Sequence, residues 1–142
     1  IAGSAAAVER AIFACKEAGA KRAMPLPVSV PSHCALMKPA ADQLAETLNA
    51  TSFHAAEMPV INNVDVAMET DPEKIRDALI RQLYSPVRWV ETIQALKEQG
   101  VSHVYECGPG KVLSGLIKRI DREIAARPLE TGEAFEAALK GE

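Results

Sequence analysis

The chain has 142 residues, of which 48% are hydrophobic and 25% charged, so it is long enough to bury a core and is not compositionally disordered. Its net charge of −3 is spread over scattered residues with no basic stripe, which argues against a nucleic-acid partner. The longest uncharged stretch, residues 23–37, is too short and too rich in proline to span a bilayer, so no membrane association is expected. Three widely spaced cysteines argue against a disulfide framework and for a reducing, cytoplasmic location.

The first predicted element is a helix. Ser4 can cap it, and it runs to about Ala18 with Val8, Ile12 and Cys15 at helical spacing on one face. The sequence does not begin with an initiator methionine, and nothing in its first residues resembles a signal peptide. We therefore expect the chain to be a piece of a longer polypeptide.

A short apolar strand is predicted next, over residues 26–30, stopping at Pro31. Ser32 can cap a following helix over residues 35–48, whose leucines and alanines recur every four residues. His33 is thus expected where a strand ends and a helix begins, which is where α/β proteins place catalytic groups.

The middle of the chain predicts another strand and two helices. Residues 58–64 read as a short strand that closes on two asparagines. Asp71-Pro72 and Ser85-Pro86 each combine a capping side chain with a proline suited to a first helical turn. Two helices should therefore meet at a corner near Gln82, and the second should end at Gly100.

Toward the C-terminus we expect a strand over residues 101–107, a turn at residues 108–110, a helix over residues 111–125 and a last short helix over residues 131–140. Strands that alternate with helices predict an α/β fold with a mostly parallel sheet covered on both faces. Only about three strands are predicted, few for so many helices, which suggests that further strands belong upstream.

His33 is the best candidate for a general base, because imidazole titrates near neutral pH and can activate a hydroxyl or a thiol. A histidine that merely caps the helix is an equal alternative. Asn62 and Asn63 can donate to a substrate oxygen or can simply make a turn, and composition does not choose between the two. The chain contains no Gly-x-Ser-x-Gly nucleophile elbow, so a base here lacks a partner of that kind.

Other polar clusters favour ordinary structural roles. The Gly108–Lys111 segment lacks the glycine spacing and the Ser/Thr of a phosphate-binding P-loop, so a tight turn is expected. Cys34 reads as a small buried hydrophobe rather than a nucleophile. His54, His103, Cys34 and Cys107 have no zinc-binding spacing, so no metal site is predicted.

Four segments together resemble one family. They are Leu26-Pro-Val-Ser-Val-Pro-Ser-His-Cys-Ala-Leu-Met37, Pro59-Val-Ile-Asn-Asn-Val-Asp65, Arg81-Gln-Leu-Tyr-Ser-Pro-Val87 and Tyr105-Glu-Cys-Gly-Pro-Gly-Lys-Val-Leu113. In the same order along nearly the whole chain, they closely resemble the C-terminal half of the bacterial malonyl-CoA:acyl-carrier-protein transacylases of fatty acid synthesis.

The resemblance implies part of an α/β-hydrolase-like three-layer domain with a mostly parallel sheet, together with the end of a small ferredoxin-like subdomain. Residues 1–28 would finish the small subdomain, and residues 29–142 would form the C-terminal part of the large acyltransferase domain. The family transfers malonyl from coenzyme A to an elbow serine and then to the phosphopantetheine thiol of acyl carrier protein. It needs no cofactor or metal.

By this resemblance His33 is the base that deprotonates the serine and then the thiol, and the main-chain carbonyl of Gln82 orients it. Ser32 and Asn63 are candidate substrate-binding residues. Ser32 stands where malonyl-selective polyketide acyltransferases carry phenylalanine and methylmalonyl-selective ones serine. Stand-alone bacterial transacylases also have Pro-Ser-His, so malonyl is the expected acyl group.

The family's serine, oxyanion-hole groups and malonate-binding arginine belong to the N-terminal half, which is the first expected partner, beside acyl carrier protein and the coenzyme A thioester. Alone, this chain would be inactive. The alternative reading is a non-catalytic fragment or a carrier-protein-binding module, in which cations at positions 111, 118, 119 and 122 contact acidic carrier protein. A cysteine hydrolase using Cys34 and His103 is the remote third.

Overall fold

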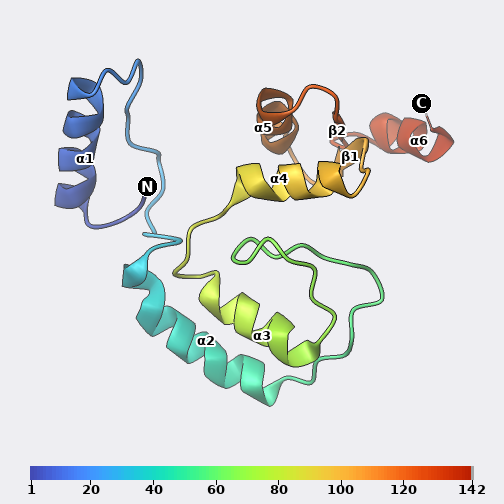
Figure 1. Cartoon of the computed structure of the whole chain (residues 1–142), viewed down its shortest axis with the longest axis horizontal. Coiled ribbons are helices and arrows are strands. Elements are labelled where there is room, and N and C mark those ends of the chain that lie inside the picture. The colour runs from blue at the N-terminus through green and yellow to red at the C-terminus, as the bar shows by residue number, and fades with distance from the viewer. Residues whose placement is uncertain (142) are drawn as a thin grey trace. The chain divides into compact units, whose positions relative to one another are not determined.

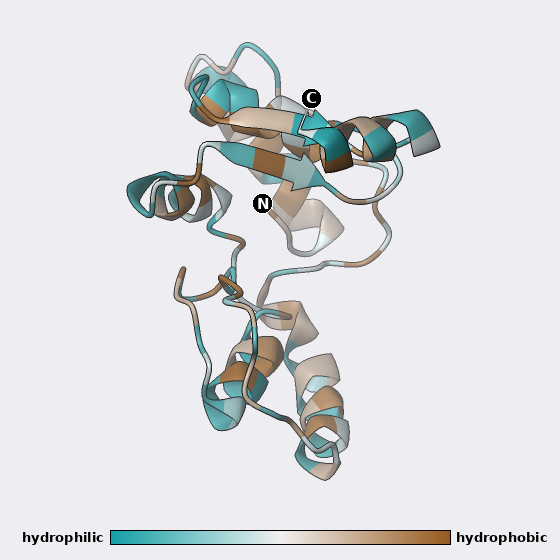
Figure 2. Ribbon diagram, turned by 90° about the vertical axis from the view of Figure 1, so that its right-hand side faces the viewer, coloured by the Kyte–Doolittle hydropathy of each residue, from teal (hydrophilic) through white to brown (hydrophobic). Residues whose placement is uncertain are grey.

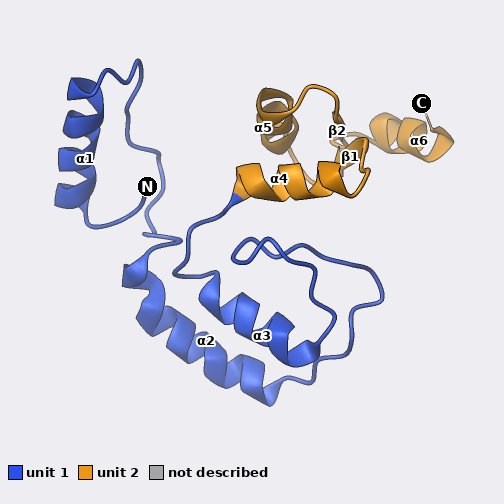
Figure 3. Ribbon diagram, in the orientation of Figure 1, with its two compact units in different colours: residues 1–88 blue, residues 89–142 orange. Residues whose placement is uncertain are grey.

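The structure is a computed structural model that describes residues 1–141. It divides into two compact units, residues 1–88 and residues 89–142 (Figure 3). The first unit contains α1 (Ala5–Glu17), the 3₁₀ turn η1 (Ala35–Met37), α2 (Lys38–Ala50) and α3 (Pro72–Arg81) (Figure 1). The second contains α4 (Trp89–Glu98), β1 (His103–Glu106), α5 (Val112–Ile120), β2 (Ala125–Pro128) and α6 (Gly132–Lys140).

Helix α1 begins as the sequence predicts. The Ser4 hydroxyl accepts a hydrogen bond from the Ala7 amide (3.4 Å), which satisfies one of the free donors of the first turn. The predicted apolar face is only partly correct. Val8 and Ile12 are half-buried, Cys15 is exposed, and none of the thirteen described residues of this helix is fully buried.

The predicted strand over residues 26–30 is wrong. These residues form irregular chain in which the amide of Val28 donates to the Leu26 carbonyl and that of Ser32 to the Val30 carbonyl, both at 2.8 Å. These tight turns form in place of hydrogen-bonded strand pairing, because the prolines around them remove backbone donors. Figure 2 shows hydrophobic residues in extended segments as well as in helices. His33 is therefore not at the end of a strand, as predicted, but in a turn between irregular chain and η1.

The predicted strand over residues 58–64 is also wrong, apart from one residue. Ile61 pairs with Met68 in an isolated antiparallel bridge, and the chain between them folds into a tight turn. The Asn62 carboxamide oxygen accepts from the amides of Val64 (3.1 Å) and Asp65 (2.7 Å). An asparagine side chain that binds its own following backbone competes with strand pairing.

Helices α2 and α3 pack against each other, with the small residues Ala41 and Ala78 fully buried. Ser32 does not cap α2 as predicted, because η1 intervenes and the helix starts only at Lys38. The start of α3 is confirmed. The Asp71 carboxylate accepts from the Glu73 amide (2.9 Å), and proline occupies the first turn.

In the second unit β1 and β2 form a parallel pair in the register His103↔Ala125 to Glu106↔Pro128. The sequence predicts β1 but not β2, which begins at Ala125, where the predicted helix over residues 111–125 was expected to end; α5 itself ends earlier, at Ile120. A small core lies between sheet and helices and consists of Ile93, Ile117, Ile124 and Ala126. The architecture is thus mixed α/β with a parallel sheet of two strands among the described residues.

The predicted start of α4 is wrong and that of α6 is confirmed. Ser85-Pro86 does not start a helix, because the Arg88 amide donates to the Asn63 carbonyl (3.3 Å) and α4 begins only at Trp89. The last helix is confirmed, with the Thr131 hydroxyl accepting from the Ala134 amide (3.2 Å).

No helix within residues 1–141 has the length and apolar character needed to cross a bilayer. A subdomain boundary near residue 28 stays a prediction.

Candidate functional site around His33

His33 adopts a left-handed backbone conformation, with φ at +61°. Few residues other than glycine adopt this conformation, although histidine does so more often than most, and surrounding contacts help to hold it. One such contact is present: the His33 amide donates to the Leu83 carbonyl (3.0 Å). The turn that carries the imidazole is therefore fixed to the end of α3.

The imidazole itself makes a second contact with the same helix end. Its Nδ1 lies 2.8 Å from the Gln82 carbonyl oxygen. A carbonyl oxygen can only accept, so this contact requires a proton on Nδ1; in the neutral ring Nε2 then carries the lone pair. Gln82 is the C-cap of α3, where carbonyls lack intrahelical partners. The predicted helix end near Gln82 is confirmed.

A shallow hollow of about 300 Å³ opens at this contact. It is lined by Ser32, His33, Met37, Gln82 and Leu83. Three of the four residues singled out from the sequence are thus neighbours, although they come from segments about fifty residues apart. His33 is exposed and lines this open hollow, so another molecule can reach the residue from solvent.

Asn63 does not line this hollow. Its carbonyl accepts the Arg88 amide, and the neighbouring Asn62 uses its side chain in the turn. The sequence left two roles open for Asn62, substrate contact or turn formation. In this structure its side chain forms the turn. A substrate-binding role for Asn63 stays a prediction.

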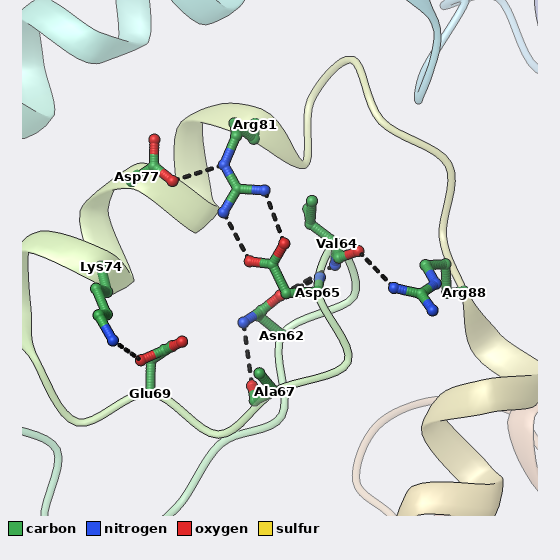
Figure 4. Close-up of polar contacts among 9 residues, drawn as sticks. All are labelled: Asn62, Val64, Asp65, Ala67, Glu69, Lys74, Asp77, Arg81 and Arg88. Carbon is green, nitrogen blue, oxygen red and sulfur yellow. Dashed lines mark hydrogen bonds and ion pairs between the residues drawn. The ribbon is translucent and has the colours of Figure 1, made fainter.

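A cluster of ion pairs next to Gln82 was not predicted from the sequence. Arg81 donates to both carboxylate oxygens of Asp65 and also to Asp77 (Figure 4). The hydrogen bonds from Arg81 lower the pKa of Asp65, and those to Asp65 and Asp77 raise the pKa of Arg81. The available signal was that Asp65 and Arg81 each lie in one of the family-like segments.

A second hollow, in the second unit, is basic. It has a volume of about 710 Å³, and its cationic lining residues are Lys118, Arg119, Arg122 and Arg127. Three of these are among the cations that the sequence suggested for carrier-protein contact. Arg127 was missed because β2 was not predicted, and Lys111 lies outside the lining.

The remaining candidates make local contacts. The Cys34 thiol donates to the Pro31 carbonyl (3.2 Å) and is half-buried. His103 Nδ1 lies 2.9 Å from the Ser102 hydroxyl oxygen. Within residues 1–141 no group of three or more histidine, cysteine, aspartate or glutamate residues is arranged to hold a metal ion.

No family model matches the sequence. Individual proteins match strongly. The malonyl CoA-acyl carrier protein transacylase of Salmonella typhimurium is 61% identical over 139 residues, which are 98% of this chain and 45% of that protein. The crystal structure of an acyl carrier protein S-malonyltransferase from Vibrio cholerae is 62% identical with a TM-score of 0.90, covering 93% of this chain and 43% of that one.

A further solved structure is that of a holo type II polyketide synthase acyl-carrier protein in complex with its malonyl-transacylase. It matches at 55% identity with a TM-score of 0.96, over 99% of this chain and 45% of that one. The chain thus spans less than half the length of these relatives. Over the portion that it spans, the chain belongs to the malonyl CoA-acyl carrier protein transacylase family.

Proposed function

We propose that this chain supplies the general base of a malonyl-CoA:acyl-carrier-protein transacylase, with His33 as the base and the Gln82 carbonyl orienting it. The observation that carries the proposal is the 2.8 Å contact between His33 Nδ1 and the Gln82 oxygen. A base must present an unprotonated nitrogen to its substrate, and in the neutral imidazole a proton on Nδ1 makes Nε2 that nitrogen.

In the first half-reaction, Nε2 takes the proton of a serine hydroxyl while the serine oxygen attacks the thioester carbonyl of malonyl-CoA. The carbon–sulfur bond breaks, and the coenzyme A thiolate leaves with the proton from the imidazolium. Malonyl is then held as a serine ester. The positive imidazolium that forms between these steps is stabilised by the Gln82 carbonyl dipole, which takes the place of a carboxylate.

In the second half-reaction, Nε2 takes the proton of the phosphopantetheine thiol of acyl carrier protein. The sulfur attacks the serine ester, the carbon–oxygen bond breaks, and the serine oxygen recovers the proton from the imidazolium. One base serves both steps because coenzyme A and the carrier protein present the same kind of thiol. Ser32 lines the hollow beside His33 and is the proposed substrate contact of this chain.

The serine is proposed to lie outside these 142 residues, in the portion of the family length that this chain does not span. The small core supports this: the long side chains that are almost fully enclosed are Ile93, Ile117 and Ile124, while Leu26, Met58 and Val60 are more than 60% exposed. Such side chains are expected to pack against the remainder of an α/β-hydrolase-like domain in a cytoplasmic enzyme, with residues 1–28 completing the ferredoxin-like subdomain.

A transfer assay tests this proposal. The chain is produced within a polypeptide of full family length and supplied with malonyl-CoA and holo acyl carrier protein. Malonyl transfer to the carrier thiol is expected, and it should disappear in His33→Ala. Transfer that persists in that variant would overturn the assignment of the base.

A second candidate function, binding of acyl carrier protein without catalysis, is favoured by the basic hollow alone. Four cations facing one depression suit an acidic partner. Titrating the isolated chain with holo acyl carrier protein at rising salt tests this function. Binding that weakens with salt and with Arg119→Gln, in a chain that never supports transfer when completed, would favour the binding module over the enzyme.

A further inference from the structure

A bidentate ion pair between Asp65 and Arg81 lies at the end of α3. Its arginine directly precedes Gln82 and Leu83 in the sequence, and the carbonyls of these two residues contact His33. Arg81 Nη1 donates to one carboxylate oxygen of Asp65 (2.9 Å), and Nη2 donates to the other (2.6 Å). Arg81 is the last residue of α3, directly before Gln82. Because a planar guanidinium matches both oxygens of a carboxylate, the pair fixes direction as well as distance.

The loop that carries Asp65 is itself rigidly built. Asn62 spans it, accepting from the Val64 and Asp65 amides and donating through Nδ2 to the Ala67 carbonyl (3.0 Å) (Figure 4). Val66 is held at a φ of +56° within the same turn. Asp65 is therefore presented to α3 from a fixed position, and we refer to residues 62–67 as the Asn62 turn.

The Asn62 turn holds the chain on both sides of Gln82. On the helix side, Arg81 also donates through Nε to Asp77 (2.6 Å), so all three guanidinium nitrogens are engaged. On the far side, Arg88 donates through Nη1 to the Val64 carbonyl and through its amide to the Asn63 carbonyl, both at 3.3 Å. The segment between Arg81 and Arg88 is thus anchored at both ends.

That segment contains the carbonyls of Gln82 and Leu83, which hold the ring and the backbone of His33. His33 is in a strained conformation that depends on such contacts. A shift of the helix end by about 1 Å would lengthen both hydrogen bonds and release the ring, since a base acts only from a narrowly defined position.

We propose that Asp65 and Arg81 are positioning residues for the base: by fixing the end of α3, they keep His33 in its Nδ1–H form with Nε2 aimed into the hollow. This inference rests on the proposed function of His33. Neither residue touches a reacting atom. Their effect passes through the two carbonyls to the imidazole.

The first test needs no turnover. Histidine ¹⁵N spectra of the 142-residue chain report which ring nitrogen carries the proton, and His33→Ala assigns the signal. The wild type is expected to show the Nδ1–H form, whereas Arg81→Lys and the near-isosteric Asp65→Asn should show a mixture of both forms. Lys74→Gln is the control, because it removes another ion pair of α3, the one with Glu69 (3.7 Å), eight residues before Gln82 in the sequence.

The second test is kinetic, in the polypeptide of full family length. Each single variant is expected to lower kcat by about tenfold with KM changed less than about twofold. Since both act through one ion pair, the double variant Asp65→Asn/Arg81→Lys should be no slower than either single one. Lys74→Gln should keep wild-type kcat.

The outcomes separate this inference from the proposed function. If Arg81→Lys and Asp65→Asn keep both the wild-type tautomer and the wild-type kcat while His33→Ala is inactive, the positioning role is wrong and the base stands. If His33→Ala remains active, the proposed function falls, and the tautomer spectra still decide whether the pair orients the ring. Should Arg81→Lys fail to fold, the spectra and kcat of Asp65→Asn alone decide between the same two results.

Discussion

The imidazole of His33 and the main-chain carbonyl of Gln82 lie 2.8 Å apart although 49 residues separate them in the sequence. A main-chain oxygen is a durable partner for an imidazole, because no side-chain substitution removes it. It is also a weaker one than a carboxylate, since it carries no full charge. Its orientation depends on where the helix ends, so in the proposed function the backbone of α3 takes the role that an acidic side chain has in a Ser-His-Asp triad.

His33→Ala should lower malonyl transfer by about a hundredfold or more in the polypeptide of full family length, because it removes the proposed base of both half-reactions. Steady-state transfer to holo acyl carrier protein measures this. His54→Ala is the control, since His54 is exposed and away from the hollow, and it should retain wild-type rates. Equal losses in the two variants would mean that the effect is not specific to His33.

Gln82→Ala should change the transfer rate by less than about threefold, since the substitution keeps the carbonyl that His33 contacts. The rate is measured together with the far-ultraviolet circular dichroism of the variant. A severe loss in a normally folded Gln82→Ala protein would contradict the account and would assign a role to the side chain.

Glu106→Gln should lower Tm at neutral pH. The Glu106 carboxylate accepts the amides of Leu113 (3.0 Å) and Ser114 (2.7 Å) at the start of α5, and these hydrogen bonds lower its pKa. A carboxylate whose pKa is lower in the folded state stabilises the fold above its unfolded-state pKa, and this stabilisation is lost as the pH falls through the folded-state value.

The difference in Tm between wild type and Glu106→Gln should therefore be full at pH 7 and shrink as the pH falls below about 4.3, the ordinary glutamate pKa. Thermal melts across this pH range provide the measurement. Glu98→Gln, at an exposed position near the end of α4, is the control and should show little difference at any pH. A gap for Glu106→Gln that stays constant down to pH 3 would refute the assignment.

Ile117→Ala should destabilise the second unit by about 2–5 kcal/mol, because Ile117 is 1% exposed and belongs to a core of few side chains. Chemical denaturation monitored by Trp89, which packs against this core, measures the change. Leu116→Ala, on the same helix and 37% exposed, should cost about 1 kcal/mol or less. Similar costs at both positions would show that the core is not where the structure puts it.

Local chemistry allowed several elements to be predicted. Ser4, Asp71 and Thr131 each cap a helix where the sequence predicts a start, because a cap depends on residues within one turn. The two strands predicted near Leu26 and Met58 fail for the opposite reason. A strand needs a partner, and apolar runs broken by proline or asparagine have none within residues 1–141 beyond the single bridge at Ile61.

The site was only partly predictable. His33 stood out because histidine is rare here and titrates near neutrality, and the end of a helix near Gln82 followed from the proline signal at Ser85-Pro86, although that signal does not itself start α4. The pairing of Asp65 with Arg81 could not be predicted in this way. It brings a turn and a helix end together across 16 residues, and no local rule specifies such a contact.

The most direct test of the central claim is intact mass spectrometry with peptide mapping after malonyl-CoA is added to the polypeptide of full family length and, separately, to the 142-residue chain. We expect one malonyl adduct on a serine outside residues 1–142 in the longer polypeptide and none on the chain alone, because the proposed role of this chain is to supply the base and not the nucleophile. An adduct mapped to a residue of this chain, or no adduct on the longer polypeptide, would contradict it.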